Sequence, residues 1–238
     1  TKITTFTFSP NNHNYHRYID EIKINDKNSN SYNKHTTLVQ LNDSTVVVAF
    51  EGKDSDGMIQ TLKIKADGII TKLKKFEHDT NLGQHNALVR VDDNTVALAY
   101  YASNKGTLKT FDIATDGTIT QVASKDFSTG SNAGKYNQLV RLNTNIFVHA
   151  YSGVSADGFI DAYDISADGK TIALKKSLEH DEAQNSYNSL IKIGLNRVAL
   201  AYTGVDTDGF VKSFDITSDG TTISQDINLE HDKSSATY

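Results

Sequence analysis

The sequence predicts an all-β protein made of repeated four-stranded units, and three observations support this prediction. Segments of one pattern begin at His35, His85, Tyr136, Tyr187 and Tyr238, at steps of 50, 51, 51 and 51 residues. Each unit carries an Asp-Gly pair between two alternating apolar runs, which is a strong signal for a β-hairpin. No stretch of useful length has apolar residues at the 3.6-residue period of an amphipathic helix.

Four strands are expected in each unit, in a fixed order. In the second unit the first strand is expected at residues 88–91 and the second at 95–100, with a turn at 92–94. The nearly continuous apolar run of the second strand indicates burial on both faces. In the last unit the third strand is expected at 210–216 and the fourth at 222–229. The Asp-Gly turns that join third to fourth strands are Asp67-Gly68, Asp116-Gly117, Asp168-Gly169 and Asp219-Gly220.

The N-terminal segment matches only the second half of a unit. Residues 2–8 resemble a third strand and residues 18–26 a fourth strand, joined by a longer connection than the Asp-Gly turns. The expected organisation is a single domain with a half-blade at 1–31, blades at 32–82, 83–133, 134–184 and 185–235, and the start of a further unit at 236–238.

Four antiparallel strands in a unit of this length form one blade of a β-propeller. A lone blade cannot bury both faces, and a ring of blades buries them without leaving a free end. Four blades and a half-blade therefore predict a five-bladed propeller, which is favoured over a linear β-solenoid with its shorter coils. Ring closure needs two further strands, and a longer chain or another copy would supply them.

The repeated unit also resembles a known kind of repeat. The segment "YNSLIKIGLNRVALAYTGVDTDGFVKSFDITSDGTTISQDINLEHD" is similar to the tandem propeller repeats of large microbial surface or secreted proteins, with a blade layout like that of YVTN and WD propellers. The chain length is similar to that of five-bladed tachylectin-like lectins. The resemblance implies a propeller fold and an extracellular or cell-surface location. The chain has no tryptophan, on which the sugar sites of those lectins rely.

Composition excludes several classes of function. The 238 residues carry a formal net charge of −5 with scattered Lys and Arg, which argues against nucleic acid as a partner. The absence of cysteine excludes disulfides, thiolate metal sites and a Cys nucleophile. No apolar run approaches the roughly 18 residues that span a bilayer, so membrane insertion is not expected. No Gly-rich phosphate loop, HExxH or GxSxG motif occurs.

The trio Glu-His-Asp recurs where the fourth strand leaves a blade. The equivalent positions in the other units are expected to be Lys125-Asp126-Phe127 and Ile24-Asn25-Asp26. Because an active site needs one constellation whereas a crossover is needed once per blade, repetition favours a structural role, with Asp bonding turn N–H groups. A repeated ligand or metal pocket and catalysis are the alternatives. The candidate residues are His78, Asp79, His180, Asp181, His231 and Asp232.

A second set of candidates starts the innermost strands. In a propeller this position and the loop between second and third strands open on the same face of the disc. Ring stacking on Tyr or His, with hydrogen bonds from Asn, would suit a glycan, but packing between blades is the favoured interpretation. The candidate residues are His35, His85, Asn86, Tyr136, Asn137, Tyr187 and Asn188.

Two further features are polar residues in unusual places. Asp54 and Asp56, like Asp206 and Asp208, stand two apart before a glycine, as at the start of a calcium loop. Because the rest of that motif is missing, a tight polar turn is expected, with Ca²⁺ as the alternative and no other cofactor. His149 replaces an apolar residue of the other units and is expected to be a hydrogen-bonded core histidine.

These features predict an extracellular or cell-surface module for binding or adhesion, with multivalent glycan recognition as its most concrete form. Equal sites on several blades would gain avidity. The sequence favours a protein without catalytic activity. The alternatives are a polysaccharide-active lyase or hydrolase on a propeller scaffold, and an architectural repeat of a large surface protein. Binding would be equal in each blade, whereas catalysis would rest on one unequal set of residues.

Overall fold

The computed structural model describes residues 2–8, 16–24 and 34–232, and these residues form an all-β structure. It contains four antiparallel four-stranded sheets and one two-stranded sheet, each formed from consecutive strands. The fold class expected from the sequence is confirmed: a half-blade is followed by four full blades of a β-propeller. Every sheet lies within one of the expected units, because no described strand crosses a predicted boundary.

The strands of each blade run in sequence order from the inside to the outside. The half-blade contains β1 (Lys2–Phe8) and β2 (His16–Lys23). The first two full blades contain β3 (Thr37–Gln40), β4 (Thr45–Glu51), β5 (Gly57–Ile64) and β6 (Ile70–Asp79), then β7 (Gln84–Arg90), β8 (Thr95–Ala102), β9 (Lys105–Ile113) and β10 (Ile119–Thr129). The last two contain β11 (Lys135–Arg141), β12 (Ile146–Ser152), β13 (Gly158–Ile165) and β14 (Ile172–Asp181), then β15 (Ser186–Lys192), β16 (Arg197–Thr203), β17 (Gly209–Ile216) and β18 (Ile223–Asp232).

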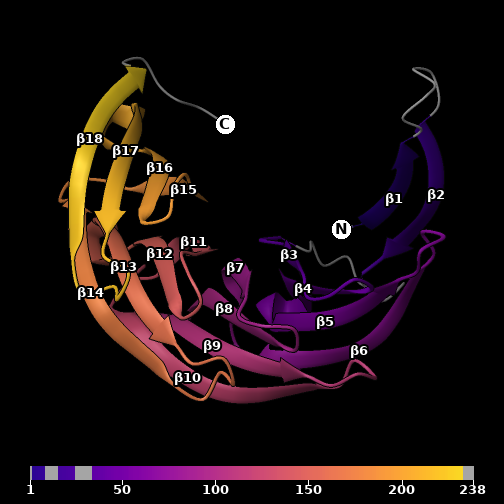
Figure 1. Cartoon of the computed structure of the whole chain (residues 1–238). Helices are drawn as coiled ribbons and strands as arrows, with labels where there is room; N and C mark the ends of the chain where they lie inside the picture. The colour runs from indigo at the N-terminus through magenta and orange to yellow at the C-terminus, as the bar shows by residue number, and fades with distance from the viewer. Residues whose placement is uncertain (1, 9–15, 25–33, 233–238) are drawn as a thin grey trace.

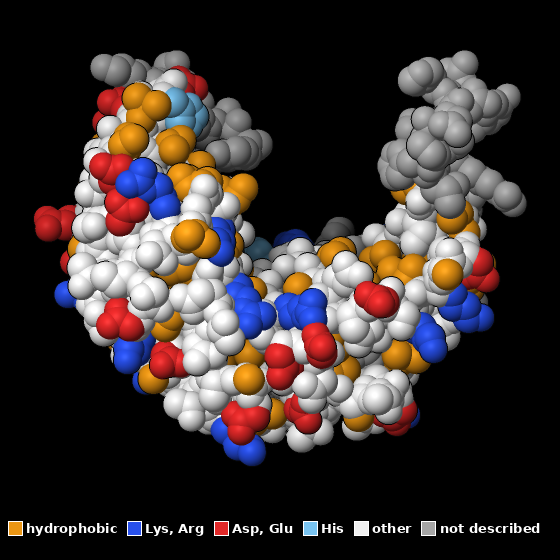
Figure 2. Space-filling model, viewed as in Figure 1, with side chains coloured by type: hydrophobic (Ala, Val, Ile, Leu, Met, Phe, Trp, Pro, Cys, Tyr) orange, Lys and Arg blue, Asp and Glu red, His pale blue; other side chains and the backbone are white. Residues whose placement is uncertain are grey.

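The blades are arranged around an axis as an open arc (Figure 1). The first strands β3, β7, β11 and β15 line the inside of the arc, and the fourth strands β6, β10, β14 and β18 lie on its outside. The arc is open between the half-blade and the β15–β18 sheet, and Figure 2 shows the same opening in the space-filling view.

The hydrophobic core lies between neighbouring blades. Alternation along each second and third strand sends apolar side chains to both faces of the sheet, and each of the first three full blades contributes to two clusters. Phe111, Tyr163 and Phe214 occupy equivalent places on the third strand and are fully buried against the preceding blade. Burying a side chain of this size contributes about 1.5–3 kcal/mol, so blade-to-blade packing is the main stabilising interaction.

Polar contacts also fix each blade to the next at the Asp-Gly turns. Gly68, Gly117 and Gly169 adopt positive φ at these turns, and the N–H of each donates to the carbonyl of the residue three positions earlier. The carbonyl of Gly117 accepts a hydrogen bond from Thr61 Oγ1 at 2.8 Å, and that of Gly169 accepts one from Thr110 Oγ1 at 2.6 Å. In both cases the threonine belongs to the preceding blade, so the turn that closes one hairpin also binds its neighbour.

Candidate functional site

The Glu-His-Asp histidines pack into the blade interface. The trio forms the end of the fourth strand rather than the crossover beyond it. The His78 ring lies on Gly57, the first residue of the third strand, where a Cβ atom would come within 2.3 Å of the imidazole. Its edge meets the Tyr100 ring of the next blade at 4.6 Å between centroids. His180 repeats the arrangement with Gly158 and Tyr202, so the repeated histidine joins two blades.

Burial keeps these histidines neutral. Desolvation, reinforced by the charge of Lys109, lowers the pKa of His78 to about 3. Desolvation and the charge of Lys212 do the same for His180. The ring nitrogens of both residues are buried without a hydrogen-bond partner. His231 belongs to the last described blade and is exposed.

The aspartates of the trio hold the crossover and reach the next blade. Asp79 accepts hydrogen bonds from the N–H groups of Asn81 and Leu82, and from the Tyr100 hydroxyl at 3.0 Å. Burial raises the pKa of Asp79, but these donors outweigh burial and bring its pKa below the usual value. Lys109 donates to the His78 carbonyl from the next blade. Asp181 makes the same contacts with Tyr202 and the crossover N–H groups of Ala183 and Gln184.

The second blade lacks this trio, and the structure corrects its expected alignment. Phe127, rather than Asp126, takes the place of His78, because its ring lies on Gly106 as the His78 ring lies on Gly57. Ser128 then pairs with Gly106 where Asp79 pairs with Gly57. Asn25 and Asp26 of the half-blade lie outside the described residues.

The second blade has Ser128 in place of the aspartate of the trio, and the third blade supplies a carboxylate of its own, Asp161. Asp161 stands where the neighbouring blades have Lys109 and Lys212, and accepts a hydrogen bond from the Tyr163 hydroxyl at 2.9 Å. Burial raises the pKa of Asp161 to about 6. His149 on the adjacent strand is completely buried, and its Nε2 lies 2.9 Å from Asn137 Oδ1, as a hydrogen-bonded core histidine should.

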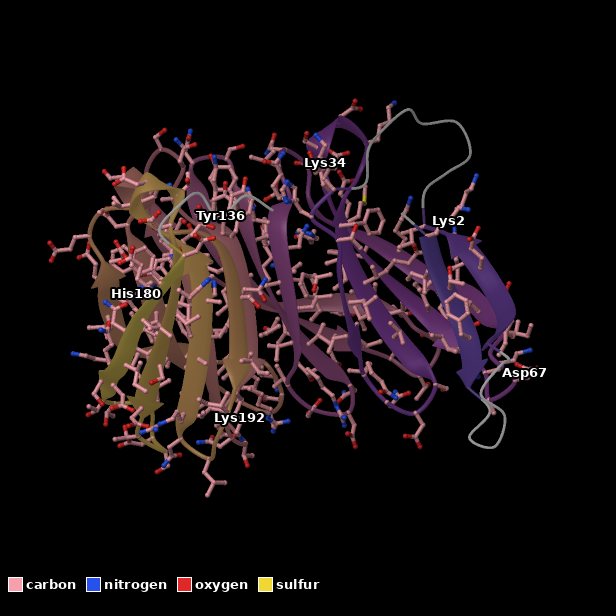
Figure 3. All side chains as sticks on the ribbon, turned by 90° about the horizontal axis from the view of Figure 1, so that it is seen from above. Lys2, Lys34, Asp67, Tyr136, His180 and Lys192 are labelled. Atoms are coloured by element: carbon pink, nitrogen blue, oxygen red, sulfur yellow. The ribbon has the colours of Figure 1, made fainter. Side chains whose placement is uncertain are left out.

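The residues that start the innermost strands form a continuous row of rings. His35, His85, Tyr136 and Tyr187 have positive φ values of 52–53°, which are uncommon for residues other than glycine. Successive ring centroids are 4.2, 4.6 and 4.8 Å apart. Tyr136 and Lys34 lie at one face of the arc and Lys192 at the opposite face (Figure 3). The row follows the inner rim of the first face, and we call it the rim row.

The asparagines beside the rim row are bound to the backbone. The side-chain amide of Asn86 donates to the His35 carbonyl at 3.1 Å, and that of Asn137 donates to the His85 carbonyl at 2.9 Å. Asn188 repeats the bond to the Tyr136 carbonyl at 3.0 Å. Each bond joins one blade to the blade before it and holds the unusual backbone in place. These amide N–H groups are therefore occupied by the fold.

One acidic residue breaks the repetition of the rim. Glu51 ends its second strand opposite Gly57, and the equivalent residues of the other blades are Tyr101, Ser152 and Thr203. The Glu51 side chain is 8% exposed, and its Oε2 lies 3.8 Å from His35 Nε2. Its Oε1 accepts a hydrogen bond from Gln84 Nε2 at 2.9 Å, whereas Oε2 is buried without a hydrogen-bond partner.

Glu51, His35 and His85 together form an unequal set of titratable groups at the rim. Burial lowers the pKa of His35, although Glu51 opposes the shift, so its imidazole is neutral at pH 7. Burial, reinforced by the neighbouring His35 and by the charge of Lys135, lowers the pKa of His85 to about 3. The four rings and the three asparagines beside them line a cavity of about 220 Å³. Glu51 was not predicted from the sequence, although a comparison of equivalent repeat positions would have found it.

The aspartates considered for calcium lie in tight turns. Lys53–Ser55 and Val205–Thr207 are single 3₁₀ turns, and Asp54 and Asp206 have positive φ within them. Asp56 and Asp208 follow each turn, and their N–H groups donate to the carbonyls of Lys53 and Val205. In the described part of the chain, no group of three or more His, Cys, Asp or Glu residues could hold a metal ion.

Comparison with known proteins supports the fold. No family model and no curated protein sequence matches the chain. The solved structure of a protein from Lactobacillus plantarum matches with a TM-score of 0.60 and 14% identity. The match covers 79% of this chain and 54% of that chain. A putative 6-phosphogluconolactonase from Bacteroides fragilis matches with a TM-score of 0.50 and 13% identity, covering 81% of this chain and 70% of that chain.

A third solved structure, Sqt1 from Saccharomyces cerevisiae, matches with a TM-score of 0.50 and 12% identity over 77% of this chain and 44% of that chain. At such identities the likeness shows the fold alone, and the chain spans about half the length of the first structure it matches. The chain is thus a β-propeller protein. No family model supports the tandem repeat family that the unit resembles.

The comparisons correct the function expected from the sequence. One of the similar structures is described as a putative 6-phosphogluconolactonase, and on this finding the expectation of a lectin-like adhesion module is wrong. The geometry agrees, because the rim asparagines expected to bind glycans donate to backbone carbonyls. The extracellular or cell-surface location stays a prediction. The described residues include no helix that is long and apolar enough to cross a membrane.

Proposed function

We propose that the chain is a hydrolase of small cyclic sugar esters, and that His35, backed by Glu51, is its general base. The observation that carries this proposal is the position of Glu51. The buried Glu51 carboxylate lies beside His35, which is neutral and partly exposed. The three residues equivalent to Glu51 in the other blades carry no charge. Catalysis requires such an unequal set, whereas the repeated residues serve the fold.

The cavity at the rim row favours a small substrate. Its volume of about 220 Å³ lies below the roughly 300–1,000 Å³ of sites for drug-sized ligands, so it suits one ring better than a polysaccharide chain. The Bacteroides fragilis protein is described as a putative 6-phosphogluconolactonase, a name that refers to a sugar lactone. Both considerations favour a sugar lactone over the polysaccharide considered from the sequence.

The chemistry assigns one role to each residue. His35 accepts a proton from water as the water oxygen attacks the lactone carbonyl carbon. The ring C–O bond of the tetrahedral intermediate then breaks, and the proton passes to the departing ring oxygen, which gives a hydroxy acid. The Glu51 carboxylate lies on the Nε2 side of His35, which leaves Nδ1 to accept the proton, and its charge stabilises the imidazolium that forms. The His85 ring is neutral, and its centroid lies 4.2 Å from that of the His35 ring. Its N–H group donates a hydrogen bond to the developing oxyanion.

The test is acid release from six-membered aldonolactones in a pH-stat, corrected for spontaneous hydrolysis. Glu51→Gln should lower kcat by about 10²–10⁴-fold, the usual contribution of general acid–base catalysis. Thr203→Val changes the equivalent residue of the last blade and is the matched control, for which kcat should stay within a factor of about two.

Three outcomes would contradict the proposal. The first is a wild type that does not accelerate lactone opening, which is the result expected of an architectural repeat. The second is full activity of the Glu51→Gln variant. Turnover of polysaccharides in the absence of lactone turnover would show that the substrate class is wrong.

A further inference from the structure

The interface between the third and fourth full blades is hollow on the face that carries the rim row. In the other two interfaces between full blades, two long side chains meet where a second strand ends. These pairs are Glu51 with Gln84 and Tyr101 with Lys135. The equivalent residues of the hollow interface are Ser152 and Ser186. Because serine is smaller than the residues of both pairs, a cavity of about 430 Å³ remains, and both serines line it.

A buried amide donor lies at the floor of this cavity. Asn185 lines the cavity, is 0% exposed, and takes the place of Gly83 and Gly134 in the two preceding blades. Its Oδ1 accepts a hydrogen bond from Asn188 Nδ2 at 2.9 Å, which identifies the other atom of the amide as Nδ2. Asn185 Nδ2 is buried and has no hydrogen-bond partner among the described residues. Since buried N–H groups are nearly always hydrogen-bonded, Nδ2 points to a ligand with an acceptor oxygen.

A single positive charge lies at the same cavity. Of the described residues that line it, Lys135 alone carries a charge. Asn132 lines the cavity as well, and its Oδ1 accepts a hydrogen bond from Lys135 Nζ at 2.8 Å. An ammonium group has three N–H donors, so this bond positions the charge and leaves donors for a ligand. Together with the Asn185 amide, the ammonium suits a ligand with one negative group.

The two serines can only accept hydrogen bonds from a ligand. Ser152 Oγ donates to the Asn185 carbonyl, and Ser186 Oγ donates to the Thr203 carbonyl at 3.4 Å. Each hydroxyl proton is therefore used by the fold, whereas the hydroxyl oxygen keeps lone pairs that accept. Neutral acceptors of this kind require O–H donors on the ligand, which a simple inorganic anion or acetate lacks.

We propose that this cavity binds a hydroxylated monocarboxylate, with the carboxylate at Lys135 and Asn185 and the hydroxyl groups at Ser152 and Ser186. The volume of about 430 Å³ falls within the roughly 300–1,000 Å³ of sites for small molecules. Neither His35 nor Glu51 is among the residues that line the cavity, so the site goes beyond the proposed reaction and does not depend on it.

Isothermal titration calorimetry at pH 7 with three probes tests this proposal. Sodium gluconate carries both the carboxylate and the hydroxyl groups, sorbitol carries only the hydroxyl groups, and sodium acetate carries only the carboxylate. Gluconate should bind as one molecule per chain. Its affinity should exceed that of sorbitol and that of acetate by about tenfold or more, since each partial probe loses hydrogen bonds that the cavity offers.

Two substitutions that copy other blades separate this site from the rest of the molecule. Lys135→Gln introduces the residue that stands at Gln84, and Asn185→Gly introduces the glycine of the two preceding blades, so both suit the fold. Each should weaken gluconate binding by about tenfold or more. Lys192→Gln, at the opposite face of the arc, is the matched control and should change the affinity by less than about twofold (Figure 3). Glu51→Gln should also bind like the wild type, whatever its effect on lactone turnover.

Nuclear magnetic resonance of the ¹⁵N-labelled wild type locates the ligand without a substitution. Gluconate should shift the side-chain amide signals of Asn185, which are assigned by their absence from the spectrum of Asn185→Gly. The proposal would be overturned if gluconate at about 10 mM did not bind, if sorbitol bound equally well, or if both variants kept the wild-type affinity. Shifts confined to His35 and His85 would place the ligand at the rim row and overturn the proposal as well.

Discussion

At the scale of single residues, the buried histidines govern how the protein responds to pH. His149 occupies the place of Val48, Leu98 and Leu200 in the other blades, and complete burial lowers its pKa to about 3. Because the folded pKa lies below the unfolded value of about 6.5, the unfolded chain binds a proton that the folded chain does not. Stability is therefore lost as the pH falls below about 6.5.

Replacement of His149 by leucine should flatten this dependence. The free energy of unfolding of the wild type should fall relative to that of His149→Leu by about 1.4 kcal/mol for each pH unit between 6 and 4. Urea titrations at several pH values measure this difference. Equal slopes for wild type and His149→Leu would contradict the burial argument.

Asp161 contributes to the pH dependence with the opposite sign. Burial raises its pKa to about 6, above the unfolded value, so the folded state holds a proton that the unfolded state releases. Asp161 therefore favours folding at low pH and opposes it as the pH rises through 6. Asp161→Asn should be more stable relative to wild type at pH 8 than at pH 5, as thermal melts at the two pH values would show. A relative stability that does not change with pH would contradict this assignment.

At the scale of elements, the third strand can begin only with glycine where a histidine ring covers it. A Cβ atom on Gly57 would lie 2.3 Å from the buried His78 ring, which has no room to move. Gly57→Ala should lower the free energy of unfolding by about 1–3 kcal/mol, the usual cost of overpacking. Chemical denaturation measures the change.

Two other glycines provide controls for this prediction. Gly209→Ala meets the exposed His231 ring at 2.5 Å, and this ring can turn away into solvent, so the loss should be smaller than for Gly57→Ala. Gly194 has its nearest neighbour at 3.5 Å, and Gly194→Ala should have little effect. Equal losses at Gly57 and Gly194 would show that contact with the ring is not the cause.

At the scale of the whole molecule, the repeat made the fold predictable and concealed the site. Hairpin turns such as Asp116-Gly117 and the spacing of apolar runs depend on local chemistry, so they are readable in sequence. The place of Phe127 was not readable, because the loop between β8 and β9 is shorter, and the loop between β10 and β11 longer, than the equivalent loops of the other blades, which shifts the alignment. Glu51 was not predicted because the predicted site residues are ones that recur in several blades, whereas Glu51 has no counterpart in the other blades.

The central claim is that recurring polar residues build the blades and that the unequal residues at the rim carry out the reaction. Measurement of Tm and of kcat for lactone opening, on Glu51→Gln and His78→Gln together, tests this claim most directly. Glu51→Gln should lose turnover and keep the Tm of the wild type, whereas His78→Gln should melt several degrees lower and keep its turnover while folded. Turnover abolished by His78→Gln at an unchanged Tm, with Glu51→Gln still active, would contradict the account.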